Sequence, residues 1–252
     1  MLIQGARALL SSGAIFPLYI YPGDADCSAW STLFDSIPAN PNLPFTLIIN
    51  PASGPGSDSV PDTTYQACIT QALSLGNNVN TVGYVLTGYG ERASADVLQD
   101  INTYMDWPVA YRPSGIFLDE TAATAEYLDQ YTSYANQVRA DDSSGSIVIL
   151  NPGINVADPG FFSIADFIVT AEAFYDDFSF PDSLIINATE PAAKQIVILH
   201  DAPSTLPTAL IDDLTSAGIA STFITSMPQG SAYNTTPPYW ESFCAELTSS
   251  QS

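Results

Sequence analysis

Strand-like apolar runs recur at intervals along this chain, with helical or loop segments between them. Eight runs are expected to form β-strands, at Ala14–Ile20, Phe45–Asn50, Thr81–Thr87, Gly115–Asp119, Ser146–Asn151, Asp166–Glu172, Gln195–His200 and Ile219–Thr225. Helices are expected at Trp30–Ile37, Asp62–Leu75, Ala93–Asp106, Thr124–Ala140, Pro159–Ser163, Ser183–Pro191, Pro207–Ala217 and Tyr239–Leu247. Strands that alternate with helices over short connections predict a parallel sheet covered by helices.

The number of these units indicates how the sheet closes. Eight strand–helix units in 252 residues are the content of a closed (β/α)8 barrel, the TIM barrel. An open doubly wound sheet would have fewer strands and a glycine-rich phosphate loop, and Ser53-Gly54-Pro55-Gly56 does not continue as G-x-G-x-x-G. The sequence therefore predicts an α/β protein with one domain over residues 1–252, a single (β/α)8 barrel with its core at about 13–247.

The expected strand Gly115–Asp119 carries the first chemical signal, because its apolar run ends in two adjacent carboxylates, Asp119 and Glu120. Side chains alternate along a strand, so Asp119 shares one side with Gly115 and Phe117, while Glu120 follows where the chain turns. Two interpretations are open. The acids cap the next helix, whose first turn favours negative charge, or they are functional carboxylates at the C-terminal end of a buried strand.

Polar and aromatic residues also gather at the ends of the other expected strands. In a (β/α)8 barrel these ends form the C-terminal rim, where the active site lies. Aromatic faces and carboxylates on one rim are typical of a carbohydrate cleft. The residues expected to bind substrate are Tyr19, Tyr21, Asn50, Tyr84, Thr87, Tyr89, Arg92, Asn151, Tyr175 and His200. For Arg92, orientation of a catalytic carboxylate and a surface ion pair are both open.

Charge narrows the classes of partner. The chain has 27 acidic and 5 basic residues and a formal net charge of −22. We therefore expect no nucleic-acid partner, because phosphate binding needs Lys and Arg. No window approaches the roughly 18 unbroken apolar residues of a membrane span. The acidity fits a protein that works in an acidic or extracellular medium, and it would attract cations.

The remaining signals concern processing and covalent links. Met1–Ser12 is not a convincing signal peptide, and the tail Thr248–Ser252 is expected to be disordered. The three cysteines, Cys27, Cys68 and Cys244, allow one internal disulfide, and we predict Cys27–Cys68 because both fall at the start of neighbouring helical segments. The sequons at Asn187 and Asn234 permit glycosylation if the chain is secreted.

No metal-ligand spacing exists among the cysteines, and His200 is the only histidine. We therefore expect no metal and no cofactor.

Five motifs follow one another in an order that identifies a family. They are Pro17-Leu18-Tyr19-Ile20-Tyr21-Pro22, Ile49-Asn50-Pro51-Ala52-Ser53-Gly54-Pro55-Gly56, Gly83-Tyr84-Val85-Leu86-Thr87-Gly88-Tyr89-Gly90-Glu91-Arg92, Gly115-Ile116-Phe117-Leu118-Asp119-Glu120 and Leu150-Asn151-Pro152-Gly153. In these motifs the chain resembles the spherulin-4-like family, which is glycoside hydrolase family 135. The match runs from about Gly13 to Leu247, and the Asn-Pro-Ala-Ser-Gly-Pro-Gly block and the Asp-Glu pair are its most specific parts.

The resemblance implies a secreted, mostly fungal (β/α)8 enzyme. Such an enzyme cuts inside α-1,4-linked N-acetylgalactosamine runs of galactosaminogalactan, an exopolysaccharide of biofilms. The acidic residues of the family map onto Asp119, Glu120 and Glu172, which are therefore the expected catalytic residues. A polysaccharide substrate and a monomeric protein are the partners and state that we expect.

Strand parity suggests how the acids meet. If Phe167 and Val169 face the helices, Glu172 faces the barrel axis, two strands away from Asp119. We expect Glu120 and Glu172 to be the acid and the nucleophile or base, with Asp119 tuning the pair. Attack by the substrate's own acetamido group is excluded, because in an α-linked sugar that group lies on the same side as the leaving group. Retention and inversion both remain open, since the carboxylate separation decides between them.

Three other functions remain possible at this stage. Cleavage of a deacetylated, cationic galactosamine polymer would suit the negative charge. A non-catalytic wall or spore-coat protein would bind the polysaccharide without cutting it. A deacetylase is disfavoured because such chemistry usually needs a histidine-rich metal site.

Overall fold

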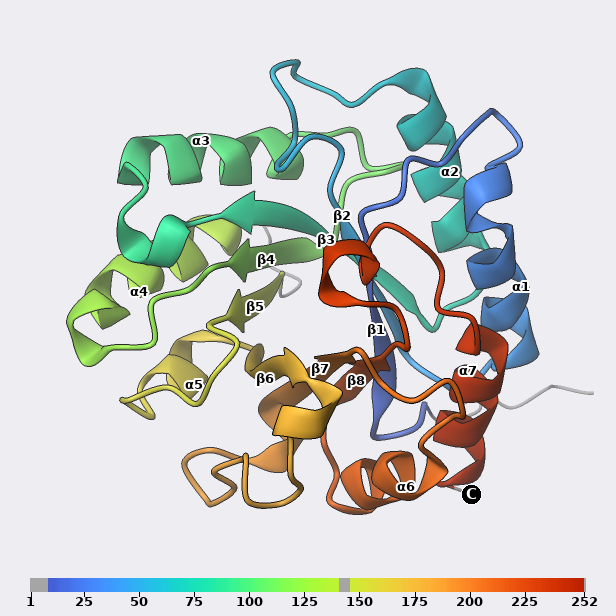
Figure 1. Cartoon of the computed structure of the whole chain (residues 1–252). Helices are drawn as coiled ribbons and strands as arrows, with labels where there is room; N and C mark the ends of the chain where they lie inside the picture. The colour runs from blue at the N-terminus through green and yellow to red at the C-terminus, as the bar shows by residue number, and fades with distance from the viewer. Residues whose placement is uncertain (1–8, 141–145, 252) are drawn as a thin grey trace, which may run out of the picture.

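Strands β1 and β8 pair at their first residues and close a ring of eight parallel strands in sequence order (Figure 1). The computed structural model describes residues 9–140 and 146–251. The strands are β1 (Gly13–Leu18), β2 (Phe45–Ile49), β3 (Val79–Leu86), β4 (Gly115–Asp119), β5 (Ile147–Asn151), β6 (Phe167–Phe174), β7 (Gln195–His200) and β8 (Ser221–Ile224). The predicted (β/α)8 barrel is confirmed, and each predicted strand overlaps an observed one.

Helices lie around the outside of the ring, as Figure 1 shows. They are α1 (Ser31–Ala39), α2 (Thr63–Ser74), α3 (Ser94–Met105), α4 (Leu128–Val138), α5 (Phe161–Ile164), α6 (Thr208–Ser216) and α7 (Trp240–Ser249). The helix predicted at Ser183–Pro191 is wrong, because the segment forms turns. The Asn187 side chain accepts hydrogen bonds from the backbone N–H groups of Thr189 (2.8 Å) and Glu190 (3.1 Å), which offers the backbone an alternative to a helix.

Ser12 and Gln251, near the two ends of the described residues, are hydrogen-bonded to each other at the end of the barrel where the strands begin. The backbone N–H of Ser12 donates to Gln251 Oε1 (2.8 Å), and Gln251 Nε2 donates back to Ser12 O (3.0 Å). The disorder expected for Thr248–Ser252 is therefore wrong up to Gln251, the last described residue. Most of the Met1–Ser12 segment lies outside the described residues.

The first helices are fixed by a cap and a covalent link. Asp62 caps α2, its side chain accepting hydrogen bonds from the backbone N–H groups of Thr64 (2.8 Å) and Tyr65 (3.1 Å). A disulfide joins Cys27, in the loop after β1, to Cys68 on the buried face of α2. The predicted pairing is confirmed, and Cys244 is left as a buried free thiol.

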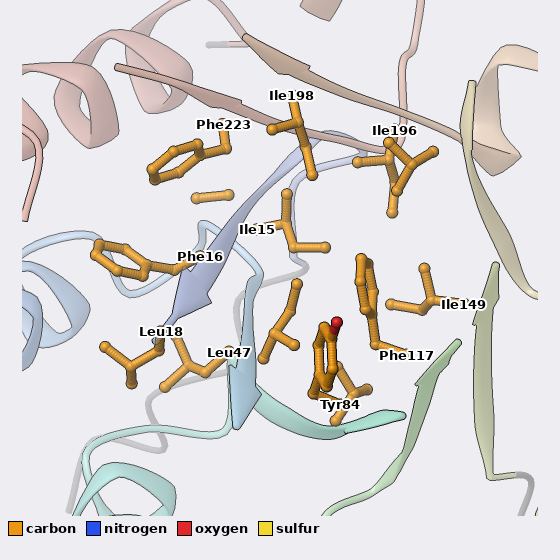
Figure 2. Packing of buried hydrophobic residues seen from close by; sticks show 14 of the residues in the cluster. Ile15, Phe16, Leu18, Leu47, Tyr84, Phe117, Ile149, Ile196, Ile198 and Phe223 are labelled. Carbon is orange, nitrogen blue, oxygen red and sulfur yellow. The ribbon is translucent and has the colours of Figure 1, made fainter. Parts of the chain in front are cut away.

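Apolar side chains fill the inside of the barrel (Figure 2). Tyr84 of β3, Phe117 of β4 and Ile149 of β5 are partners in register and point inward together. The Tyr84 and Phe117 rings stack with centroids 6.4 Å apart. Because Asp119 lies two residues beyond Phe117, it shares the inward side and emerges above this packed layer. The parity predicted for β4 is therefore confirmed.

Strand β6 departs from the predicted alternation. Its register against β7 pairs Val169 with Ile196 and then Ala171 with Val197, so that Thr170 is an extra residue in a β-bulge. Such a bulge bends the strand and re-aims the side chains that follow.

Because of the bulge, Glu172 points inward as predicted, although the facing predicted for Phe167 and Val169 is wrong. Phe167 is in register with the inward-pointing Ile149, so Phe167 and Val169 face the barrel interior, and the prediction that they face the helices is wrong. Without a bulge, Glu172 would then point outward. The extra residue restores it to the inner side, in register with Ile198, which also points inward (Figure 2).

Candidate active site

A hollow of about 360 Å³ opens at the C-terminal rim of the barrel. We call it the acidic hollow, because it contains all three predicted catalytic residues. Its lining residues are Tyr89, Asp119, Glu120, Asn151, Pro152, Gly153, Ile154, Glu172, His200 and Gln229. Four of the ten predicted substrate-binding residues lie at this hollow. Tyr89, Asn151 and His200 line it, and Tyr84 contacts the Asp119 carboxylate.

Asp119 is held at the end of β4 by two donors. The Tyr84 hydroxyl donates to Asp119 Oδ2 (2.7 Å), and Asn151 Nδ2 donates to Oδ1 (2.7 Å). Asn151 reaches Asp119 because the two residues are register partners on β4 and β5. Both oxygens of the carboxylate are therefore fixed in direction by neighbouring strands.

Glu172 shares one of these donors. Asn151 Nδ2 also donates to Glu172 Oε2 (2.7 Å), and the Tyr233 hydroxyl donates to Oε1 (2.6 Å). One amide nitrogen thus bridges the two carboxyl groups, so that the bridged oxygens are separated by no more than two hydrogen-bond lengths. The structure brings Asp119, rather than Glu120, into this direct partnership with Glu172.

Burial is the main influence on the pKa of Glu172. Removal from water raises the pKa of this carboxyl above its ordinary value, and the nearby Asp119 charge raises it further. Hydrogen bonds from Tyr233 and Asn151, together with His200, oppose the rise. The net pKa shift is upward, which is the direction that a proton-donating carboxyl group requires.

Glu120 enters the acidic hollow from a constrained backbone. Its φ is +50°, in the left-handed region that non-glycine residues seldom occupy. The carbonyl of Glu120 accepts hydrogen bonds from the Tyr89 backbone N–H (2.6 Å) and from Thr87 Oγ1 (2.7 Å). These bonds hold the turn that aims the Glu120 side chain into the hollow, and such local strain is common at functional sites.

Thr87 has a different role from the one predicted. Its side chain is 1% exposed, and its hydroxyl contacts the carbonyls of Asp119 (2.9 Å) and Glu120 and the hydroxyl of Tyr131. With its hydrogen bonds taken up inside the protein, Thr87 fastens the end of β4 and does not reach a ligand.

Three other predicted binding residues lie away from the acidic hollow. Arg92 forms an ion pair with Asp100 of α3 (2.7 Å) and donates to the Leu86 carbonyl (2.9 Å), so the surface-pair alternative is confirmed. Tyr21 packs edge-on against Tyr65, with ring centroids 5.5 Å apart. Tyr175 packs against the hydrophobic core and lines neither the acidic hollow nor the neighbouring hollow that contains Tyr19 and Asn50.

His200 is fixed at the end of β7. It is 2% exposed, its ring meets Phe174 edge-on at 4.5 Å, and Nδ1 lies 2.8 Å from Asp201 Oδ2. The same Asp201 oxygen accepts a hydrogen bond from the backbone N–H of Gln229 (2.9 Å). Asp201 therefore ties the histidine to the loop that follows β8.

A second hollow, of about 490 Å³, adjoins the first and holds the remaining predicted residues, Tyr19 and Asn50. We call it the neutral hollow, and its lining residues are Tyr19, Asn50, Pro51, Ala52, Ser53, Gln229, Gly230, Tyr233 and Asn234. Tyr19 packs against Tyr233, the other tyrosine of this hollow, and against Tyr84, whose hydroxyl contacts Asp119 of the acidic hollow. The Tyr19 ring meets Tyr84 at 5.4 Å and Tyr233 at 5.8 Å, both edge-on.

Three residues of the two hollows were not predicted from the strand ends, namely Tyr233, Gln229 and Ile154. Tyr233 and Gln229 lie in the loop between β8 and α7, several residues beyond the strand. The available signal was the loop's length together with its tyrosine, because every βα loop of a barrel borders the rim. Ile154, 61% exposed beside the acids, carries no comparable signal.

The described residues contain neither a metal-binding cluster nor a helix that could span a membrane. Within them, no group of three or more His, Cys, Asp or Glu side chains has the arrangement to hold a metal ion. None of the helices in this part of the chain combines the length and hydropathy needed to cross a bilayer.

Another hollow of about 360 Å³, at the opposite end of the barrel, contains one acid, Asp166, already bound to Arg139 (2.7 Å).

Comparison with known proteins identifies the family of the chain. The model of the family described as spherulation-specific family 4 matches residues 13–247. Spherulin-4 from Physarum polycephalum is 39% identical over 159 residues, which make up 63% of this chain and 44% of that protein. The crystal structure of Aspergillus clavatus Sph3 in complex with GalNAc has a TM-score of 0.81 and 29% identity, covering 94% of this chain and 97% of that one. The chain belongs to spherulation-specific family 4, the spherulin-4-like family of glycoside hydrolase family 135.

Proposed function

We propose that the protein is a secreted, endo-acting glycoside hydrolase that cleaves α-1,4-linked N-acetylgalactosamine stretches of a galactosaminogalactan-type exopolysaccharide. The observation that carries the proposal is the Asn151 amide, which holds Asp119 and Glu172 together at 2.7 Å each. A pair of carboxyl groups flanking one bond is what glycoside hydrolysis requires. The likeness to Sph3, solved with GalNAc, supports the choice of sugar.

The separation of the pair favours retention of configuration. Retaining glycosidases hold their carboxyl groups about 5–5.5 Å apart, whereas inverting enzymes need about 6.5–9.5 Å to admit a water molecule. Two hydrogen bonds to one nitrogen fit the shorter distance. The protein must also supply the nucleophile, because the acetamido group of an α-linked sugar cannot attack from behind.

The first chemical step follows from the two environments. Glu172, whose pKa is raised by burial, donates its proton to the glycosidic oxygen as the bond from that oxygen to C1 breaks. An Asp119 oxygen bonds to C1 from the opposite face and forms a covalent glycosyl intermediate. The released chain end carries the proton that Glu172 gave up.

The second step reverses the roles. Glu172, now a carboxylate, accepts a proton from water, whose oxygen bonds to C1 while the bond to Asp119 breaks. Two displacements at C1 return the original α configuration. Glu120 and the exposed Tyr89 ring, at the open side of the hollow, would contact the hydroxyl groups and the apolar face of the sugar.

The disulfide supports the proposed secretion. Cys27 and Cys68 are bonded, and such bonds persist mainly in oxidising compartments.

The decisive experiment incubates the protein with purified galactosaminogalactan and identifies the products by mass spectrometry and NMR. We expect new reducing ends on N-acetylgalactosamine oligomers, with the first-formed ends in the α configuration. Glu172→Gln should lower the rate by about 10²–10⁴-fold, the contribution of a general acid. Binding without new reducing ends would instead identify a polysaccharide-binding protein, and first-formed β ends would exclude the covalent intermediate.

A further inference from the structure

The neutral hollow has no part in the bond-breaking steps, yet it has the dimensions and lining of a ligand site. Its volume of about 490 Å³ falls within the range of pockets that hold small ligands, about 300–1,000 Å³. The described residues that line it include no charged side chain. They offer side-chain amides, hydroxyls and the rings of Tyr19 and Tyr233, which are groups that bind the hydroxyls and apolar faces of sugars.

The neutral hollow and the acidic hollow share a lining residue. Gln229 lines both, and its backbone N–H is fixed by Asp201 (2.9 Å). Tyr233 lines the neutral hollow with its ring and donates its hydroxyl to Glu172 (2.6 Å). A ligand in the neutral hollow therefore lies one side chain away from the proposed proton donor.

We infer that the neutral hollow is a second sugar-binding site, which takes an uncharged sugar unit of the same polysaccharide whose scissile bond lies between Asp119 and Glu172. The inference rests on the proposed function for the identity of the polymer. It adds the path of the bound polysaccharide across the rim, from the acidic hollow past Gln229 to the loop 50–53. It also adds a preference, because no carboxylate among the described lining residues is available to pair with an ammonium group there.

Gly230 provides a clean way to test this site. A Cβ built on Gly230 meets no atom within 4 Å, and its φ lies outside the left-handed region. Gly230→Trp therefore places a large side chain at the neutral hollow without backbone strain. Val109→Trp is the matched control, because Val109 is 77% exposed in the loop that leads into β4, at the opposite end of the barrel.

The experiment measures binding, so that it does not depend on hydrolysis. Both tryptophan substitutions are made in Glu172→Gln protein, and calorimetry measures binding of free N-acetylgalactosamine, of size-fractionated α-1,4-linked N-acetylgalactosamine oligosaccharides, and of the same oligosaccharides after chemical deacetylation. We expect Gly230→Trp to weaken binding of the acetylated oligosaccharides at least about 10-fold, the loss of about 1.4 kcal/mol. Binding of the free sugar in the acidic hollow and all binding by the Val109→Trp control should match the parent.

The outcomes separate the two proposals. Unchanged affinity of Gly230→Trp for the acetylated oligosaccharides would overturn the second site, and an equal or larger loss for the deacetylated ones would overturn its preference for uncharged sugar. If wild-type protein releases no reducing ends but Gly230→Trp still weakens binding, the hydrolase proposal fails and the binding site stands.

Discussion

At the scale of single residues, Asn151 is hydrogen-bonded to the carboxyl groups of both Asp119 and Glu172. Its amide nitrogen has two hydrogens, and each is directed to a different carboxyl group. The bridge sets the separation of Asp119 and Glu172 and opposes the rise of the Glu172 pKa. Asn151, which was predicted to bind substrate, therefore contacts the two proposed catalytic groups directly.

Replacing Asn151 by Asp tests the bridge with little change in shape. The substitution removes both donated hydrogen bonds and places a third acid between two others, which drives the carboxyl groups apart and raises the Glu172 pKa further. We expect kcat/KM on the polymer to fall by about 100-fold or more, as a small misplacement of reacting groups does. Asn80→Asp, an exposed change at the opposite end of the barrel, is the control. Equal activity of the two variants would contradict the role of the bridge.

Tyr233 controls the pH dependence through Glu172. Its hydroxyl stabilises the ionised carboxylate, so Tyr233→Phe should raise the Glu172 pKa above its already elevated value. Because the proposed acid works in its protonated form, the alkaline limb of the kcat/KM profile should move to higher pH. Tyr239→Phe removes a hydroxyl that does not contact the site's carboxylates and should leave the profile unchanged. A shift to lower pH would indicate that Glu172 is not the proton donor.

The sequence indicated the rim residues to different degrees. Asp119, Glu172, Asn151 and His200 all end apolar runs, and a parallel barrel carries every such end to one rim. Arg92 also follows a strand end, but the nearby Asp100 binds it, and strand-end position does not reveal which carboxylate a long side chain will meet. Local sequence therefore predicts where a residue lies better than what it contacts.

At the scale of elements, β6 shows why strand parity alone is insufficient. The inward position of Glu172 requires the extra residue Thr170, whose hydroxyl donates to Gln195 Oε1 (2.9 Å). A bulge is defined by the register between two strands, so the apolar pattern of one strand does not reveal it. The prediction placed Glu172 correctly although it assigned Phe167 and Val169 to the wrong face.

The Cys27–Cys68 disulfide ties the loop after β1 to α2 and closes a loop over a sequence separation of 41. We expect Cys27→Ala with Cys68→Ala to lower the free energy of unfolding by about 2–4 kcal/mol, because the unfolded chain gains freedom. Neither cysteine lines the proposed catalytic site, so kcat/KM at 25 °C should be retained. Denaturant titration measures the change. Reductant should lower the stability of wild-type protein to that of the double variant, and a reductant-insensitive wild type would contradict the prediction.

At the scale of the whole molecule, closure of the barrel explains how distant segments form one site. The side chains that hold the two carboxyl groups come from β3, β5 and the loop after β8, and closure brings β8 next to β1, which leads to Tyr19. The barrel was predictable because eight apolar runs repeat with helices between them. The packing of Tyr19 against Tyr84 and Tyr233 was not predictable, because it depends on the loop after β8. Tertiary contacts set the path of this loop, such as the hydrogen bond from the Tyr19 backbone N–H to the Tyr233 carbonyl (3.1 Å).

The net charge of −22 gives a final prediction that separates two polymers by their response to salt. A deacetylated galactosamine chain is cationic, so the field of the protein should speed its association at low ionic strength. Raising the salt from 0.1 M to 1 M shortens the screening length from about 10 Å to about 3 Å and should weaken that attraction. An N-acetylated chain is uncharged, and its kcat/KM should stay nearly constant over the same range. Initial rates on matched acetylated and deacetylated polymers test this prediction. If cleavage of the neutral polymer fell steeply with salt, long-range attraction, rather than the uncharged lining of the neutral hollow, would govern its capture.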